Sequence, residues 1–282
     1  MVAASTIGAG LTLAGTKPVL AEFQIQEAGI EKGEVELEYR GASHWGVPQV
    51  TGTNDNANDL VQSHEFELQM GITDWWASLS NYRPGSTAGR KLARQCSRDR
   101  TEFALLKRQG DGIALSFQTG YEQAFNHGAK VDGNANQFGF GPIVELAKGP
   151  FLLTLNPLFT KQIGTFADQE GLGFEYGWRG EYDFTKHWGI GVEMFGEIED
   201  LANAGPFNSQ VHSLGPTLFY NFGGDEDEAK GGDDKPGKAK ASGEEQASEP
   251  SAMAFSMNVG VQFGLTDATS DTALKFQGSL AF

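Results

Sequence analysis

The sequence predicts an all-β protein, a transmembrane antiparallel up-and-down β-barrel of about twelve strands. Three observations predict this fold. Apolar and polar residues alternate in short stretches along the chain, the connections alternate between tight turns and longer polar loops, and the last stretch ends on the terminal residue, Phe282. A period of two is the pattern of a strand with two unlike faces, and turns at one end with loops at the other are typical of outer-membrane barrels.

Composition agrees with this fold and excludes several others. The 282 residues include 38 Gly and 20 Phe, and no run of about 18 apolar residues occurs, so a helical membrane span is excluded. The formal net charge of −16 argues against nucleic acid as a partner, because phosphate binding needs clustered Lys and Arg. Cys96 is the single cysteine, which excludes an intramolecular disulfide and a Cys-rich metal site.

The N-terminus has the pattern of an export signal. An apolar stretch from Ile7 to Ala14 is followed by Val19-Leu20-Ala21, a small-residue cleavage pattern, so residues 1–21 are expected to be a signal peptide and residues 22–282 the barrel. No Lys or Arg precedes the apolar stretch, which leaves a disordered apolar N-terminus as the alternative. The dozen or so residues before the first strand are too few for a plug domain.

Alternation identifies the strands in order. In "GEVELEYRG" (33–41), Val35, Leu37 and Tyr39 lie opposite the charged residues. The same pattern recurs in "SHEFELQMGI" (63–72), "GIALSFQTGYE" (112–122), "GLGFEYGWRGEYDF" (171–184) and "AFSMNVGVQFGL" (254–265). With less regular stretches included, strands are expected to begin near residues 34, 62, 75, 101, 112, 136, 150, 171, 187, 210, 253 and 272.

The links between these strands follow a rule. Links after the second, fourth, sixth and eighth strands are tight, whereas those after the first, third, fifth, seventh and ninth are longer and polar. An even strand number puts both termini on the tight-turn side, as a single-chain barrel requires. Residues 223–252 break the rule with a charged, Gly-, Pro- and Ser-rich stretch, expected to be a disordered acidic insertion. It is either a plain spacer or a tether for cations or a cationic partner.

Polarity separates a membrane barrel from a soluble sheet. Soluble sheets turn polar faces to water, whereas closing these strands around a polar lumen, with the aromatic-rich faces outward, pairs every backbone group and leaves no edge. Trp75, Trp76, His187 and Trp188 stand at tight turns, where amphipathic rings anchor at headgroup depth. The same residues could instead staple their hairpins.

The final strand resembles the C-terminal signature of Gram-negative outer-membrane β-barrel proteins, in which apolar residues alternate up to a terminal aromatic. The matching residues are Leu274, Phe276, Leu280 and Phe282, with Leu280 where Tyr is common. The resemblance implies a bacterial outer-membrane location, recognition of this strand by the barrel assembly machinery, and closure of the last strand against the first.

Three short stretches are similar to strand ends of the barrel family associated with MetA-pathway phenol degradation. They are "GITDWWASL" (71–79), "DFTKHWGIGVE" (183–193) and "FGLTDATSDTALKF" (263–276). The similarity implies aromatic hydrocarbons as solutes, whereas the residues themselves do not identify the solute.

Charged residues on the polar faces are the candidate lumen lining: Glu36, Glu38, Arg40, Glu65, Glu67, Glu145, Glu175, Arg179, Glu181, Glu193, Glu197 and Lys275. They either pair across strands, such as Arg179 with Glu193 and Lys275 with Glu36 or Glu38, or attract cations into a partly wet lumen. Since carboxylates are in excess, we expect a preference for cations if the lumen conducts.

A basic stretch, "YRPGSTAGRKLARQCSRDR" (82–100), is expected in an external loop. Its residues Arg90, Lys91, Arg94, Arg98 and Arg100 could contact anions, either lipopolysaccharide phosphates or anionic solutes, or simply be solvated.

Catalysis and metal binding find no support in the sequence. The five histidines are scattered, and His212 and Ser213 are adjacent on a strand, so they point to opposite faces. Gly-x-Ser-x-Gly is absent. We therefore expect no enzyme activity, no metal and no cofactor.

The sequence thus favours a passive outer-membrane channel or transporter for a small solute, with a cation-preferring lumen and with lipid and lipopolysaccharide around it. The alternative is a structural or binding barrel whose lumen is closed by its own charge network. A lipid-modifying enzyme would need a Ser and a His brought together from different strands.

Overall fold

The computed structural model describes residues 23–29, 31–48, 60–84, 96–125, 135–165, 167, 169–223 and 253–282. The expected signal peptide at 1–21 and the expected insertion, apart from Gly223, lie outside these ranges.

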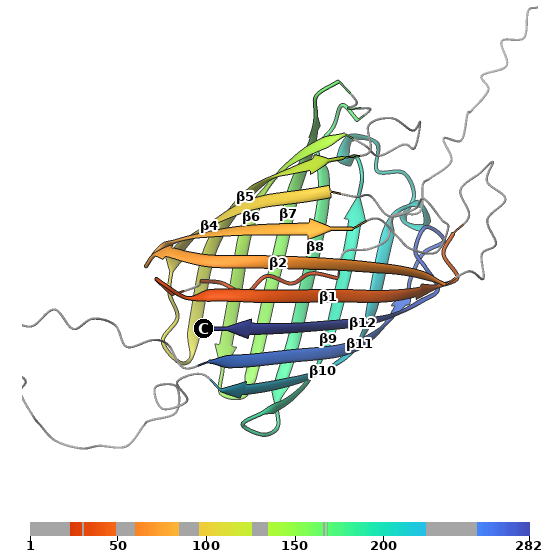
Figure 1. The fold of residues 1–282 in the computed structure, drawn as a ribbon. Helices are drawn as coiled ribbons and strands as arrows, with labels where there is room; N and C mark the ends of the chain where they lie inside the picture. Colours follow the sequence, from red (N-terminus) through yellow and green to blue (C-terminus); the bar gives the residue numbers. More distant parts are fainter. Residues whose placement is uncertain are drawn as a thin grey trace, which may run out of the picture.

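Twelve antiparallel strands close into a barrel in chain order, with β12 pairing with β1 (Figure 1). This confirms the predicted fold. The strands are β1 Val35–Trp45, β2 Val61–Thr73, β3 Trp76–Arg83, β4 Cys96–Leu106, β5 Gly112–Ala124, β6 Asn136–Lys148, β7 Phe151–Ile163, β8 Gly173–Asp183, β9 Trp188–Ile198, β10 Val211–Gly223, β11 Ala254–Gly264 and β12 Thr272–Ala281. Eleven strands begin within two residues of the expected positions, and β4 begins five residues early, at Cys96.

The two ends of the barrel differ as the link lengths predict. Strands β2 and β3, β4 and β5, β6 and β7, and β8 and β9 are joined by tight turns at one end. The closing seam ends there too, because the Val35 and Phe282 backbones exchange two hydrogen bonds, both of 2.9 Å. The terminal phenylalanine is therefore a paired residue of the wall.

Side chains are arranged with polarity opposite to that of a soluble barrel. Large apolar side chains such as Leu37, Phe66 and Leu68 are between 42 and 51 % exposed on the outside. Glu67 and Glu193 are each only 1 % exposed on the inside. An apolar exterior around a polar interior suits lipid outside and a hydrated lumen inside.

Aromatic rings gather at the tight-turn end. The Trp75 ring stacks on Phe103 with centroids 6.1 Å apart, and the Trp188 ring lies 4.7 Å from Tyr220. Trp75, Trp76 and Trp188 are all exposed, as rings at an interface between lipid and water would be.

Two facing prolines interrupt the ladder between β6 and β7. Paired residues resume on either side, at Phe140 with Phe159 and at Val144 with Leu155, so Pro142 and Pro157 face each other in the gap. Neither proline has an N–H to donate, and the ladder loses the hydrogen bonds that both would make.

Two 3₁₀ turns, Leu201–Asn203 and Phe207–Ser209, lie in the link from β9 to β10. Asp200 caps the first by accepting a 2.8 Å hydrogen bond from the Ala202 N–H, which holds the pKa of Asp200 below its usual range. Within the described ranges, no helix is long and apolar enough to cross a membrane.

Candidate functional site: the barrel lumen

The lumen is lined by the polar face of each strand, because alternate side chains of a strand point to opposite faces. Of the residues expected there, Glu38, Arg40, Glu65, Glu67, Glu145, Arg179, Glu181, Glu193 and Lys275 are buried at inward positions. Glu36, Glu175 and Glu197 occupy inward positions of β1, β8 and β9 and are half-buried.

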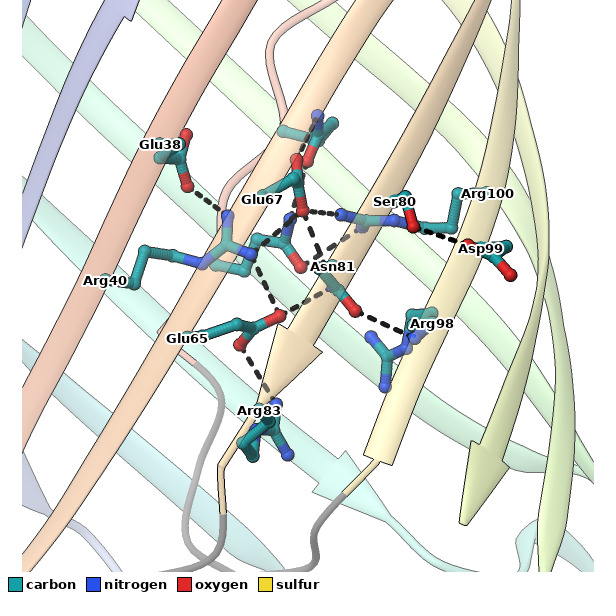
Figure 2. A network of polar contacts seen from close by, with 12 residues as sticks. Glu38, Arg40, Glu65, Glu67, Ser80, Asn81, Arg83, Arg98, Asp99 and Arg100 are labelled. Carbon is teal, nitrogen blue, oxygen red and sulfur yellow. Dashed lines mark hydrogen bonds and ion pairs between the residues drawn. The ribbon is translucent and has the colours of Figure 1, made fainter. Parts of the chain in front are cut away.

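One charge cluster centres on Arg40 of β1 (Figure 2). Its Nη2 donates to Glu65 at 3.0 Å and to Glu67 at 2.9 Å, and Glu38 accepts from its Nη1. Arg83 of β3 donates to Glu65 at 3.1 Å. Three strands thus share one network across the lumen face.

Strand β4 completes this cluster, and here a sequence expectation is wrong. Arg98 and Arg100 do not lie in an external loop, because β4 starts at Cys96 and turns both side chains inward. Arg98 donates to Glu122 at 3.0 and 2.5 Å, and Arg100 pairs with Glu67 (Figure 2 shows both arginines). Arg90, Lys91 and Arg94 lie outside the described residues, so their anion contacts stay a prediction.

Two inward carboxylates, Glu102 and Glu122, were missing from the expected lining. The signal for Glu102 is in "RDRTEF" (98–103), where Arg98, Arg100 and Glu102 alternate with Asp99, Thr101 and Phe103. Phe103 is the only apolar residue between Cys96 and Ala104, so this half-strand has too weak an apolar face to be separated from the preceding loop.

A second charge cluster joins β12 to β9 on the lumen side. Lys275 of β12 pairs with Glu193 of β9, which also accepts a 2.7 Å hydrogen bond from Thr217. Aromatic rings support the cations: Lys275 Nζ lies 5.3 Å from the centroid of Phe195, and Arg179 Cζ lies 5.2 Å from that of Phe219. These cation–π contacts stabilise charges held away from bulk water.

The pairing partners differ from those expected. Lys275 binds Glu193 instead of Glu36 or Glu38, and Arg179 makes its ion pairs with Glu27 and Glu181 instead of Glu193. The reason is that Glu27, which precedes the first strand, enters the lumen and competes for Arg179.

The N-terminal segment, residues Phe23–Gly29, runs inside the barrel (Figure 1, the thread behind β1 and β2). Lumen residues hold its backbone. The Ala28 N–H donates to Glu145 at 2.9 Å and the Gly29 N–H to Glu102 at 2.6 Å. The side-chain amide of Asn156 donates to the Gln26 carbonyl at 2.9 Å and accepts from the Gln26 N–H.

Apolar side chains fix the start of the N-terminal segment. The ring of Phe23 stacks on His44 with centroids 5.4 Å apart and meets Phe195 edge-on at 5.2 Å. Phe23 and Ile25 are buried with Phe195 in a small apolar cluster within the lumen. The signal was the alternation in "FQIQE" (23–27), which places these two residues opposite Gln24 and Gln26.

Histidines of the described strands do not converge. His212 and Ser213 face opposite sides of the wall. The Phe207 ring stacks on the His212 ring with centroids 4.6 Å apart. The Tyr176 hydroxyl and the His212 Nδ1 atom are hydrogen-bonded at 2.8 Å. In the described part of the chain, no three His, Cys, Asp or Glu side chains come close enough together to hold a metal ion.

These features define a closed barrel whose polar lumen is crossed by charge pairs and by a segment of its own chain. No protein-family model matches the chain, and no curated protein matches it. The solved structure of an outer-membrane channel from Pseudomonas putida F1 is similar with a TM-score of 0.50 at 10% identity, covering 93% of this chain and 98% of that one.

Two further solved structures are less similar. The KdgM porin in complex with disordered oligogalacturonate has a TM-score of 0.45 at 9% identity, covering 88% of this chain and 98% of its own. The outer membrane protein OprD from Pseudomonas aeruginosa has a TM-score of 0.34 at 7% identity, covering 94% and 96%. At such identities the likeness to the Pseudomonas putida channel shows the fold alone, and membership of the phenol-degradation family stays a prediction.

Proposed function

We propose that the protein is a channel of the bacterial outer membrane through which small solutes pass passively. The observation that carries the proposal is the combination of a closed barrel, an apolar exterior and a polar lumen. A barrel with these surfaces is stable in lipid and offers water-soluble molecules a polar path.

The charges of the lumen support a preference for cations. On the described strands, inward carboxylates outnumber inward cationic groups, so pairing leaves net negative charge. The carboxylates are Glu36, Glu38, Glu65, Glu67, Glu102, Glu122, Glu145, Glu175, Glu181, Asp183, Glu193 and Glu197. The cationic groups are Arg40, Arg83, Arg98, Arg100, Arg179 and Lys275. Rings of carboxylates in a pore attract cations and repel anions.

A second candidate function is a structural or binding barrel with a closed lumen. The N-terminal segment favours it, because Phe23–Gly29 occupies space through which a solute would have to pass. Both candidates fit the same fold, and conductance separates them.

The test is the single-channel conductance and cation-to-anion permeability ratio of the refolded protein in a planar bilayer. We expect small cation-selective steps, and lower selectivity in Glu193→Gln, which leaves the Lys275 charge uncompensated. Asp99→Asn is the matched control, since Asp99 is an outward carboxylate bonded to Ser80 at 2.6 Å. Silence from an inserted barrel would favour the closed structural barrel, and equal selectivity in all three proteins would contradict the assigned cation preference.

Assembly in the outer membrane is part of the proposal. Leu274, Phe276 and Phe282 are exposed on the outer face of the closing strand, where the assembly machinery could read them, and Leu280 follows the same alternation. Contacts with lipid and lipopolysaccharide would follow from the apolar exterior and its aromatic rings.

A further inference from the structure

A recess lies in the lumen wall between β4 and β7, and two glycines form its floor. Gly120 of β5 faces Gly139 of β6 directly across the strand pair. Arg100 of β4 lies beside Gly120, and Thr160 of β7 lies beside Gly139. Four neighbouring strands thus present two inward positions without side chains, bounded by a guanidinium group at one end and a hydroxyl at the other.

The rim of the recess carries hydrogen-bonding groups of both kinds. Arg98, Glu122 and Gln137 lie on one side, and Gln118 and Leu158 on the other. The charges of the rim are already matched, because Arg98 pairs with Glu122 and Arg100 with Glu67. A site of this kind offers donors, acceptors and an aliphatic surface but little net charge.

On the inward faces of β4 and β5, two buried polar atoms at the recess have no protein partner. Arg100 Nε is a donor and Gln118 Oε1 is an acceptor, and neither is hydrogen-bonded to any described residue, although the two side chains are only 7 % and 4 % exposed. Buried polar atoms are normally satisfied, so such a pair needs a partner. The recess leaves about 20 Å³ for the centre of a water-sized group, enough for one such group.

We propose that this recess binds one hydroxyl group of a small, neutral, polyhydroxylated solute in the lumen. A hydroxyl both accepts and donates, so a single group could serve Arg100 Nε and Gln118 Oε1 together. An ion is disfavoured because the neighbouring charges are compensated within the protein. The inference rests on the proposed channel function for its biological meaning, since the solute reaches the recess through the lumen.

Replacing Gly139 by Ala fills the recess without strain. A Cβ added at Gly139 would have Leu158 Cδ2 as its nearest atom at 3.6 Å, an ordinary contact, so Gly139→Ala occupies the floor and leaves the wall intact. Gly120 does not serve, because its Cβ would lie 2.5 Å from Arg100 Cγ. Gly180→Ala is the matched control, because it adds the same methyl group on β8, where nothing lies within 4 Å.

A second variant removes the acceptor and keeps the size of the side chain. Gln118→Met retains a long unbranched side chain but loses the amide oxygen that has no partner. Loss of one hydrogen bond should raise the dissociation constant of the solute by about tenfold, which is the upper end of the effect that one hydrogen bond usually has.

Binding is measured by saturation-transfer NMR on the refolded protein in detergent without a sugar headgroup. The probe is sorbitol, and triethylene glycol dimethyl ether, which accepts but cannot donate, is the comparison solute. We expect saturable sorbitol binding in wild type and Gly180→Ala, about tenfold weaker binding in Gln118→Met and Gly139→Ala, and none of the ether. Equal sorbitol binding in all four proteins, or none in wild type, would overturn the inference and leave only an ordered water in the recess.

Conductance in a planar bilayer separates this inference from the proposed function. A wild-type barrel that binds sorbitol but conducts no ions would support the recess as a site and contradict the channel. A barrel that conducts ions but shows no sorbitol binding would support the channel and overturn the recess.

Discussion

Glu67 is the residue on which the first charge cluster depends. Its carboxylate is almost fully buried and accepts from Arg40 and Arg100, and it also accepts from Gln24 at 3.1 Å and Gln26 at 3.4 Å in the N-terminal segment. Buried charges need partners, since an isolated ion loses its hydration without compensation. One carboxylate therefore compensates two guanidinium groups and also touches the segment in the lumen.

Replacing Glu67 by Gln should destabilise the barrel by about 3 kcal/mol, because two buried guanidinium groups would lose their shared counter-charge. Urea unfolding of the refolded protein in micelles, followed by tryptophan fluorescence, measures the change. Asp99→Asn removes the same charge from an outward position and should change the free energy of unfolding by less than about 0.5 kcal/mol. A similar small effect for both variants would show that water in the lumen already solvates the cluster.

At this scale the sequence predicts which faces are polar but not which groups pair. Alternation places Glu193 and Lys275 on inward faces, and their pairing depends on how β9 and β12 curve toward each other across β10 and β11. Arg179 shows a second limit, because its partner Glu27 belongs to no strand. A residue outside the repeating pattern has no face assigned to it by periodicity.

Strands β6 and β7 illustrate the element scale, because two facing prolines interrupt the ladder between them. Pro142 and Pro157 each lack the N–H that their positions in the ladder would use. The Pro157 carbonyl then approaches Gly141 so closely that a side chain at 141 would collide with it. The strands stay together here through close backbone contact, which explains a glycine at that position.

Substituting Pro157 by Val should stabilise the barrel by about 1 kcal/mol, because the new N–H can donate to the Pro142 carbonyl and Val suits a strand. The midpoint of thermal unfolding in micelles checks this. Leu155→Val, on the same face of β7, already has its N–H and should not gain stability. A lower midpoint for Pro157→Val would mean that packing of the proline ring stabilises the wall more than the added hydrogen bond does.

Element boundaries were predictable wherever one face was apolar. The starts of β5, β6 and β12 fall on the expected residues, since polar turn residues and the onset of alternation both mark them. The start of β4 was not predictable, because the outward face of "CSRDRTEF" (96–103) carries Ser97, Asp99 and Thr101 and only Phe103 as an apolar residue. Polar residues near the loop end of a barrel strand lie outside the apolar band. Both faces of the strand are then polar, so the period of two is too weak to identify the strand there.

For the whole molecule, the N-terminal segment decides whether the barrel is open. Burial of Phe23 and Ile25 contributes roughly 3–6 kcal/mol. Eight hydrogen bonds join the segment's residues to the lumen wall, and at about 1 kcal/mol each they add around 8 kcal/mol. Ordering the seven residues Phe23–Gly29 costs about 7–14 kcal/mol. The two sides are similar in size, so the segment is held weakly enough to be displaced, whereas the wall is held by twelve strand pairings.

A refolded chain that begins at residue 30 should therefore form the same barrel and conduct more. The wall keeps its pairing next to the deletion, because Gly33 N–H donates to the Gly71 carbonyl at 2.8 Å and Gly71 N–H to the Glu34 carbonyl at 3.0 Å. The measurement is single-channel conductance with circular dichroism to verify strand content.

Gln24→Ala with Gln26→Ala in the full chain is the control, since it weakens side-chain contacts and leaves the backbone in the lumen. A severalfold rise in conductance only for the shortened chain would assign the constriction to the segment, because removal of chain from a narrow lumen widens the ion path. Unchanged conductance in a correctly folded shortened barrel would place the constriction in the charge pairs of the wall instead.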